Sequence, residues 1–445
     1  MRSGVAAAAA QTSLPAGDVR VGANDRIGVA VIGCGGMGSM NLKDFQSMPE
    51  VEIRMLCDVD SRQSAKAARL VTGNKPDVVS DFRRVLDRKD IDAVVVATPD
   101  HWHAYIAIHA CEAGKDVYVE KPIATSVREG RLMLDAGRRH NRVMQVGIQQ
   151  RSGCHFQRAV ELVQSGAIGT VVYAEAWNHG HNPGGSAGTP QADRCPPELD
   201  WDMWLGPAPV REYQTNIHPV HWRVFYDYGG GNLADWGVHL IDVIQWAMKV
   251  DAPLTANAIG GSYWVRDGRD TPDTVNVVYE YPGLMVNYTH MNHCNYGRSG
   301  RFYGIIFHGS DAALLLDRSG YEVVPTTAKH IDPAGEAFRG AFDDMLGTGT
   351  YFTSERKGEW GTTSLQHVPH IANFLACMRS RKRPIGDIET GFHATLPCHL
   401  GNISYRTGVK VKWDAKSETI PNDERANRLL TRAYRAPWRL AGLEA

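Results

Sequence analysis

Long apolar runs and blocks of basic residues are both absent from this 445-residue sequence. A membrane-spanning helix needs about 20 mostly apolar residues, and no such run occurs, so a membrane is not an expected partner. The 48 lysines and arginines and the 49 aspartates and glutamates are interspersed and give a formal net charge of −1. Because no basic surface is available to follow phosphates, nucleic acid is not an expected partner either.

Cysteine motifs are also missing. The eight cysteines are scattered and form no CxxC pair, which argues against a zinc knuckle or a disulfide framework and favours buried free thiols. Close histidine pairs suggest a metal site, but few acidic residues accompany them. We therefore predict no metal, and we interpret these histidines as sugar contacts or surface residues, with His181 as a candidate substrate contact. The pairs are His179/His181, His218/His221 and His290/His293.

The first 25 residues differ from the rest of the chain. An alanine run at residues 6–10 leads into a polar stretch with proline and glycine that cannot join a core. Such a segment is typical of a disordered leader or of the trimmed tail of an export signal, although Arg2 stands alone and no twin-arginine pair is visible. Both an exported, periplasmic location and a cytoplasmic one stay open.

Residues 26–147 alternate short apolar runs with helical stretches, and a chain of this length is expected to form more than one domain. Residues 27–32 are almost wholly apolar, as in a parallel strand buried on both faces. Strands that alternate with helices need crossover connections, so we predict an α/β Rossmann domain with a doubly wound parallel sheet. Further strand patterns lie at 51–57, 93–97, 116–119 and 143–147, and helical patterns at 61–70, 102–113 and 127–140.

Residues 148–445 have a different pattern. Several strand-like runs follow one another with few helices between them, which favours a largely antiparallel sheet with one face open to solvent or to a partner. We predict an α+β domain for substrate binding and oligomerisation, and its open sheet face is a candidate contact surface for a homo-oligomer. The strand patterns are at 171–177, 274–281, 285–292, 302–308 and 313–316, and helical patterns are at 155–165, 368–378 and 393–407.

A glycine-rich turn follows the first strand and matches G-x-G-x-x-G. Its glycines permit a tight bend and let backbone N–H groups approach a pyrophosphate at the N-terminus of the next helix. Asp58 ends the second strand, where its carboxylate suits ribose hydroxyls and repels the 2′-phosphate of NADP. Arg62 is close enough to soften that preference, but NAD is the predicted cofactor. The predicted contacts in the turn are Gly33, Gly35, Gly36, Met37 and Gly38.

Two further motifs lie at predicted strand ends. Residues 97–103 read ATPDHWH, and residues 118–122 read YVEKP. A third stretch, residues 229–242, reads GGGNLADWGVHLID. Together with the glycine turn, these motifs resemble the Gfo/Idh/MocA family of NAD-dependent oxidoreductases, named for glucose–fructose oxidoreductase and inositol dehydrogenase. The resemblance covers nearly the whole chain, and it implies that a C-terminal helix at about residues 388–408 packs back on the Rossmann domain.

Asp235 and His239, in the third stretch, can also be interpreted from their chemistry. They are spaced i, i+4 at the start of a predicted helix and are expected to project from one face. Alcohol oxidation needs a base that takes the hydroxyl proton while hydride leaves for a nicotinamide. A carboxylate beside an imidazole fixes its tautomer and raises its basicity. We therefore expect Asp235 to be the partner of His239.

The resemblance implies further roles. It places Lys121 at the substrate hydroxyl beside the nicotinamide, where a positive charge would stabilise an alkoxide. Whether Lys121 or His239 takes the proton stays open at this point. The cofactor contacts that the resemblance implies, besides Lys121 itself, are Thr98, Pro99, His103 and Glu120.

Candidate substrate contacts follow from position and residue type. Gln149 and Arg151 come just after the last strand of the predicted Rossmann domain, where polar groups can reach a substrate. The ring of Trp236 is a candidate platform for the C–H face of a pyranose.

The favoured function is NAD-dependent oxidation of a secondary hydroxyl on a sugar, glycoside or cyclitol, by a homodimer or homotetramer like those of relatives. The main alternative is an NAD-dependent glycoside hydrolase that oxidises the sugar, eliminates the aglycone, adds water and reduces the ketone, so that NAD is recycled. A non-catalytic sensor with the same fold is a third class. Intact Lys121, Asp235 and His239 argue against the sensor.

Overall fold

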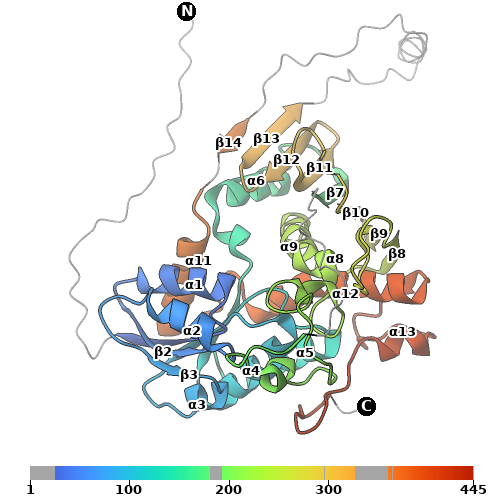
Figure 1. The fold of residues 1–445 in the computed structure, drawn as a ribbon. Helices are drawn as coiled ribbons and strands as arrows, with labels where there is room; N and C mark the ends of the chain where they lie inside the picture. The colour runs from blue at the N-terminus through green and yellow to red at the C-terminus, as the bar shows by residue number, and fades with distance from the viewer. Residues whose placement is uncertain (1–25, 181–192, 295, 326–358, 363, 444–445) are drawn as a thin grey trace, which may run out of the picture.

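The computed structural model describes residues 26–180, 193–294, 296–325, 359–362 and 364–443, which form two sheets with helices packed on them (Figure 1). Residues 1–25, for which a leader is predicted, and the candidate substrate contact His181 lie outside the described residues. Within the described ranges, no helix is both long enough and apolar enough to cross a membrane.

The first sheet is parallel and has the strand order β3-β2-β1-β4-β5-β6. Its central strand is buried at every residue, as the apolar run predicted. The order reverses between β1 and β4, which is where open α/β sheets bind ligands at the carboxyl ends of their strands. The strands are β1 Ile27–Ile32, β2 Val51–Cys57, β3 Asp77–Val79, β4 Ala93–Val96, β5 Asp116–Val119 and β6 Met144–Val146.

Helices cover both faces of this sheet, which confirms the predicted doubly wound Rossmann fold (Figure 1). Side chains of Asp60, Asp81 and Ser126 accept backbone N–H groups at the starts of three of the helices, which satisfies donors that have no partner within the helix. The helices are α1 Gly36–Gln46, α2 Ser61–Ala68, α3 Phe82–Leu86, α4 His103–Glu112 and α5 Val127–Arg139.

The second sheet has nine strands in the order β14-β13-β12-β11-β7-β10-β9-β8-β15. Only β7 and β10 pair in parallel; the other neighbours are antiparallel, as predicted. The strands are β7 Val171–His179, β8 Thr255–Gly261, β9 Thr274–Tyr281, β10 Leu284–Met291, β11 Tyr303–Gly309, β12 Ala312–Asp317, β13 Gly320–Pro325, β14 Trp360–Thr362 and β15 Val411–Lys412.

One face of the second sheet is covered by α6 (Cys154–Gln164), α9 (Gly237–Met248) and α12 (Ile388–Thr407). Burial alternates along β9 and β10 because one set of side chains faces these helices. On the opposite face, apolar side chains such as Ile259 and Met285 are exposed.

Helices from the end of the chain return to the first sheet. α11 (His367–Ser380) lies beside α1, where Phe374 contacts Phe45 edge to face with ring centroids 6.2 Å apart (Figure 1). α12 packs against α5, and Phe392 lies where a Cβ on Gly130 would be 3.1 Å away. α12 begins after the cap residue Asp387, and Pro397 lies inside the helix.

Candidate active site

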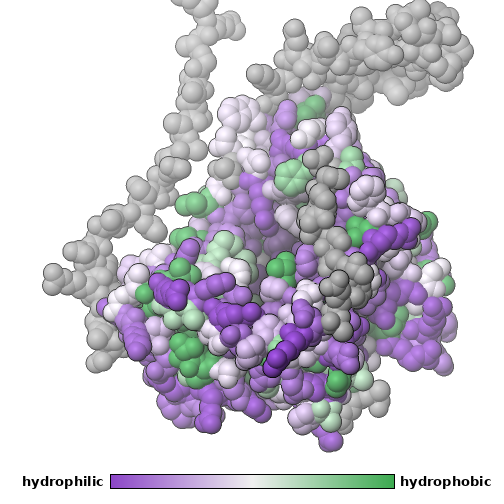
Figure 2. Space-filling view, viewed as in Figure 1, coloured by the Kyte–Doolittle hydropathy of each residue, from purple (hydrophilic) through white to green (hydrophobic). Residues whose placement is uncertain are grey.

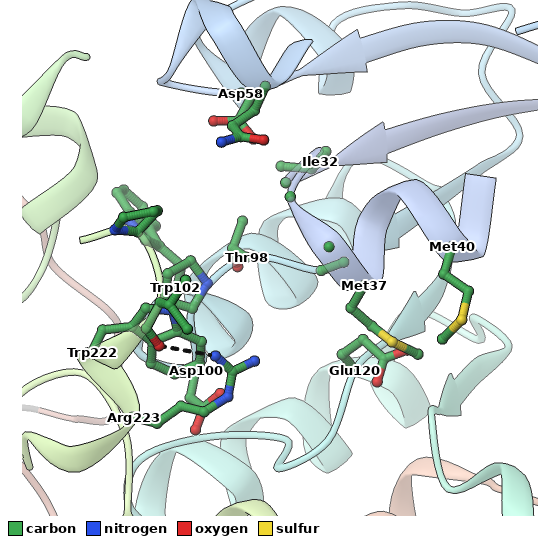
Figure 3. A pocket seen from close by; sticks show the side chains of 18 of the residues that line it. Ile32, Met37, Met40, Asp58, Thr98, Asp100, Trp102, Glu120, Trp222 and Arg223 are labelled. Atoms are coloured by element: carbon green, nitrogen blue, oxygen red, sulfur yellow. Dashed lines mark hydrogen bonds between the residues drawn. The ribbon is translucent and has the colours of Figure 1, made fainter. Parts of the chain in front are cut away.

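A cavity of about 520 Å³ lies at the carboxyl edge of the parallel sheet, between the two sheets. The face of the molecule in Figure 2 is mainly hydrophilic and is hollowed between the two parts. Figure 3 shows Asp58 at one end of the cavity and Glu120 with Met37 at the other, with Trp222 and Arg223 opposite α1. Strand ends from one domain and helices from the other therefore meet in a single cavity.

The glycine turn leaves room for a dinucleotide. Gly33 has a φ of +88°, and a Cβ there would lie 2.6 Å from the backbone of Ala97, so a side chain would be strained. Gly35 and Gly36 line the cavity, and a Cβ on either would meet nothing within 4 Å. This open cradle at the N-terminus of α1 fits a pyrophosphate. Gly38 lies outside the cavity and lets α1 approach Gly33, because a Cβ there would be 1.8 Å from its carbonyl oxygen.

Asp58 lines the cavity just beyond β2, as predicted for a ribose contact. Its carboxylate accepts the backbone N–H groups of Cys34 and Asp60 at 2.7 and 2.8 Å, which fixes its orientation. Burial raises its pKa to about 6 despite these hydrogen bonds. Arg62 donates to Asp60 at 2.9 and 2.7 Å and caps the end of that carboxylate. The guanidinium that could have accommodated a 2′-phosphate is thus engaged elsewhere, which favours NAD.

Lys121 follows β5 and reaches across the cavity to the second domain. Its Nζ donates to the Asp235 carboxylate at 2.6 Å and to the Asp235 carbonyl at 2.8 Å. Arg223 Nε lies 3.5 Å from the same carboxylate oxygen. Burial alone would raise the pKa of Asp235, but Lys121 and Arg223 hold it at about 2. Asp235 is therefore an anion that positions two cations.

His239, the third residue within α9, also lines the cavity. Its side chain is buried, and its Nδ1 has no hydrogen-bond partner among the described residues. Burial lowers its pKa well below the usual range, and the nearby charges of Lys121 and Arg318 act in the same direction. The imidazole is therefore neutral.

The predicted pairing of Asp235 with His239 is wrong. The expected single helix is interrupted: α8 (Gly231–Asp235) ends before Trp236, and α9 begins at Gly237. No hydrogen bond or ion pair joins the two side chains in the described part of the chain, although both line the cavity. Asp235 instead pairs with Lys121, which is 114 residues away in the sequence.

Two other predicted contacts do not lie in the cavity. His103 is buried, and its ring nitrogens face the carbonyl oxygens of Pro122 and Thr98 at 2.8 and 2.9 Å, so it braces two strand-end loops. Arg151 forms an ion pair with buried Asp242 at 2.8 Å and faces a separate cavity of about 470 Å³. Arg151 points away from the first cavity because Asp242, on α9, supplies a carboxylate for it.

The remaining candidates line the cavity. The Thr98 hydroxyl is buried and has no hydrogen-bond partner among the described residues, as expected for a group that awaits a ligand. The Glu120 carboxylate accepts from Asn41 at 2.9 Å, and burial raises its pKa. The other lining candidates are Gly33, Gly35, Gly36, Met37, Asp58, Pro99, Lys121, Gln149, Asp235, Trp236 and His239.

Several lining residues were not foreseen. Arg318, between β12 and β13, and His367, at the start of α11, close the cavity beside His239. Buried Asp100 faces Arg223, and burial raises its pKa well above the usual range. No local pattern marks Arg318 or His367 as site residues, since each reaches the cavity only through the packing of the second domain. Asp100 is part of the ATPDHWH motif at residues 97–103, and this motif could have marked it as a candidate site residue.

Residues 193–230, which we name the capping segment, cover part of the cavity. They contain α7 (Trp201–Leu205) and their own apolar cluster. Their attachment to the Rossmann domain includes Asp200 N to Val59 O at 2.9 Å and Trp102 Nε1 to Trp204 O at 3.0 Å. Five of the lining residues that they supply are Met203, Trp204, His218, Pro219 and Trp222.

Two of the histidines considered for a metal, His179 and His290, are hydrogen-bonded within the protein. His179 Nε2 lies 3.0 Å from Thr289 Oγ1, and His290 contacts the Asn178 carbonyl at 2.8 Å. His218 lies 3.9 Å from buried Asp60. Within the described ranges, no group of three His, Cys, Asp or Glu side chains converges as a metal site.

Comparison with known proteins shows which family the chain matches. Residues 27–148 match the GFO_IDH_MocA oxidoreductase family with its NAD-binding Rossmann fold, and residues 161–259 and 363–440 match the C-terminal alpha/beta domain of that family. The chain belongs to the Gfo/Idh/MocA oxidoreductase family. The resemblance inferred from the motifs and the NAD-binding assignment of the first domain are thus confirmed.

Similar proteins include sugar dehydrogenases. Levoglucosan dehydrogenase of Pseudarthrobacter phenanthrenivorans is 32% identical over 359 residues, which are 70% of this chain and 82% of the relative. A glycosyl hydrolase family 109 protein of Shewanella pealeana is 31% identical over 159 residues, 34% of this chain and 35% of the relative. The oxidoreductase YrbE of Bacillus subtilis is 30% identical over 146 residues, and the match spans 33% of this chain and 42% of that protein.

Solved structures show the same fold. A levoglucosan dehydrogenase complex with NADH and levoglucosan has a TM-score of 0.64 at 20% identity and covers 87% of this chain and 99% of its own. The WlbA dehydrogenase of Bordetella pertussis in complex with NADH and UDP-GlcNAcA has a TM-score of 0.60 at 18% identity, with the same coverage of both chains.

Proposed function

We propose that this protein oxidises a secondary hydroxyl of a sugar, glycoside or cyclitol with NAD. The observation that carries the proposal is that Lys121 and His239 open into the same cavity as the glycine cradle and Asp58. The relatives add the substrate class: levoglucosan dehydrogenase is named for an anhydrosugar, and a WlbA structure holds a nucleotide sugar.

NAD, when bound, supplies the acceptor for the hydride that leaves the carbinol carbon. The glycine cradle and Asp58 would hold its pyrophosphate and ribose, and Thr98 and Glu120 also line the cavity. The residues that act on the hydroxyl are then Lys121 and His239, which lie on facing domains.

We assign to His239 the role of base, which takes the proton of the substrate hydroxyl. We assign to Lys121 the role of hydrogen-bond donor to the oxygen of that hydroxyl. The His239 imidazole is neutral because burial lowers its pKa. Its Nδ1 has no hydrogen-bond partner among the described residues and is the nitrogen that would take the hydroxyl proton. Lys121 Nζ carries three N–H donors, and two hydrogen bonds to Asp235 occupy two of them. Its third donor is available to the hydroxyl oxygen, where the positive charge stabilises a developing alkoxide. Asp235 acts through Lys121 as a positioning residue.

The test offers purified protein a panel of sugars, glycosides and cyclitols with excess NAD and follows NADH absorbance. NADH should accumulate with at least one secondary alcohol, and Lys121→Met should abolish this while NAD still binds. If no member of the panel yields NADH although NAD binds, the proposal fails.

A second arm tests redox-recycling glycoside hydrolysis. Chromogenic glycosides are offered with only catalytic NAD, and aglycone release without net NADH would favour the hydrolase. The family 109 relative covers only 34% of this chain, so the similarity gives this reading less support than the dehydrogenase reading.

A further inference from the structure

Arg318 lines the cavity and, within the residues that the structure describes, forms no ion pair with a carboxylate. Lys121 and Arg223 share Asp235, with ion-pair distances of 2.6 and 3.5 Å. Arg318 lines the same cavity, yet among the described residues no carboxylate lies within 4.0 Å of its guanidinium. A largely buried charge without a partner is costly, so such a charge points to a ligand that supplies the counter-charge.

The acidic neighbour of Arg318 is already engaged. Asp317 forms an ion pair with Arg301 at 3.0 Å and accepts the Ser319 backbone N–H at 2.6 Å. The turn between β12 and β13 therefore directs Asp317 and Arg318 to different partners. Burial lowers the pKa of the Arg318 guanidinium, which agrees with a charge that has little local compensation.

Aromatic contacts hold Arg318 at the catalytic end of the cavity. Its guanidinium carbon lies 5.2 Å from the ring centroid of Trp236, and its backbone N–H donates to the Tyr303 hydroxyl at 3.1 Å. Trp236 in turn lies 6.3 Å, centroid to centroid, from His239. A guanidinium packed on an indole keeps its N–H edge available for a planar anion.

We propose that Arg318 recognises a carboxylate on the sugar, so that the substrate is a uronic acid or its glycoside. This inference rests on the function proposed above. A single guanidinium fork matches one planar carboxylate in charge and geometry. The carboxylate then contacts Arg318 while the reacting hydroxyl contacts Lys121 and His239.

The cofactor phosphates are the competing ligand for Arg318. The cradle for the pyrophosphate is at Gly35 and Gly36, whereas the carboxylates that act electrostatically on Arg318 are Asp235 and Glu120. Glu120 lies at the other end of the cavity from Asp58 (Figure 3). The experiment must therefore measure binding of NAD as well as binding of the sugar.

The test compares methyl glucuronide with methyl glucoside, which differ at the carboxylate. We expect the parent enzyme to prefer the glucuronide in kcat/KM, and Arg318→Ala to reduce that kcat/KM about 10- to 100-fold, as expected for loss of a charge-assisted bidentate contact. For the glucoside, the fall in kcat/KM caused by Arg318→Ala should be at least tenfold smaller than for the glucuronide, and the Kd of NAD should change less than about threefold. Arg318→Lys should recover part of the loss, and Arg84→Ala, which removes an exposed arginine, should match the parent.

Three results would overturn the assignment: preference for the glucoside, a glucuronide preference that survives Arg318→Ala, or a large rise in the Kd of NAD in that variant. Quenching of bound NADH fluorescence by each sugar provides a second readout that needs no turnover. If neither sugar is oxidised, this binding assay still decides the role of Arg318, and the oxidation panel separately decides the proposed function.

Discussion

At the scale of single residues, burial and neighbouring charges set the protonation states of Asp235 and His239. Asp235 is ionised with a pKa of about 2 because Lys121 and Arg223 outweigh the effect of burial. His239 is neutral because burial and neighbouring positive charges act together. The carboxylate therefore pairs with the lysine, and in the described part of the chain no carboxylate pairs with the imidazole.

Asp235→Asn should lower kcat about 10²-fold, because Lys121 loses the anion that positions it and the remaining carbonyl contact cannot replace a charge. KM and the Kd of NAD should change little, as expected for a positioning residue. Steady-state kinetics and nucleotide titration measure this, with Asp135→Asn, an exposed site on α5, as the matched control. A kcat within threefold of the control would contradict the assigned role.

At the scale of elements, residues after α13 (Glu424–Arg428) contact both the capping segment and the Rossmann domain. Arg435 donates to the Gly206 and Asp202 carbonyls at 2.6 and 2.7 Å. Trp438 packs edge to face on Trp102, with centroids 4.9 Å apart. The C-terminal residues thus hold the capping segment against the Rossmann domain.

Arg435→Ala should raise the Kd of NAD about tenfold, because two charge-assisted hydrogen bonds that fix the capping segment are lost. At saturating NAD, kcat should remain near that of the parent. Tryptophan fluorescence titration checks the affinity, and Arg439→Ala, at an exposed neighbouring arginine, is the control. Equal Kd values in the two variants would show that this anchor does not support cofactor binding.

At the scale of the whole molecule, neutral histidines are distributed through the interior. Burial lowers the pKa of His101 to about 3 and the pKa values of His103, His218, His290, His370 and His399 to about 4. An unfolded histidine has a pKa of about 6.5. Between these values the unfolded chain binds more protons than the folded one, so stability falls as the pH falls.

We therefore expect the free energy of unfolding to be greatest above pH 7 and to fall as the pH drops from about 6.5 to about 4, by up to about 1.4 kcal/mol per pH unit for each such histidine. Asp58 and Asp270 oppose this trend, because their folded pKa values of about 6 exceed the unfolded ones. Urea unfolding at a series of pH values measures the net change in the free energy of unfolding. A stability that stays constant from pH 7.5 to 5 would contradict it.

Assembly is a second property at this scale. Ile259 and Met285 are 73% and 46% exposed on the open face of the nine-stranded sheet, where a second subunit could bury them. We predict a homodimer or homotetramer that Ile259→Glu weakens, measured as molar mass by light scattering. Val210→Glu, at an equally exposed valine of the capping segment, should leave the mass unchanged. A parent protein that is monomeric at micromolar concentration would refute this prediction.

The sequence alone determined the parallel sheet, the glycine cradle and the positions of Lys121, Asp235 and His239, because strand periodicity and short motifs are local properties. It missed β3, since Asp77 and Val78 are exposed and form no apolar run. Only the tertiary structure decided the partners. Asp235 pairs with Lys121, Arg151 is drawn to Asp242, and Arg318 enters the cavity from a distant turn. Pairings of this kind depend on which elements pack together, and no local sequence pattern records that packing.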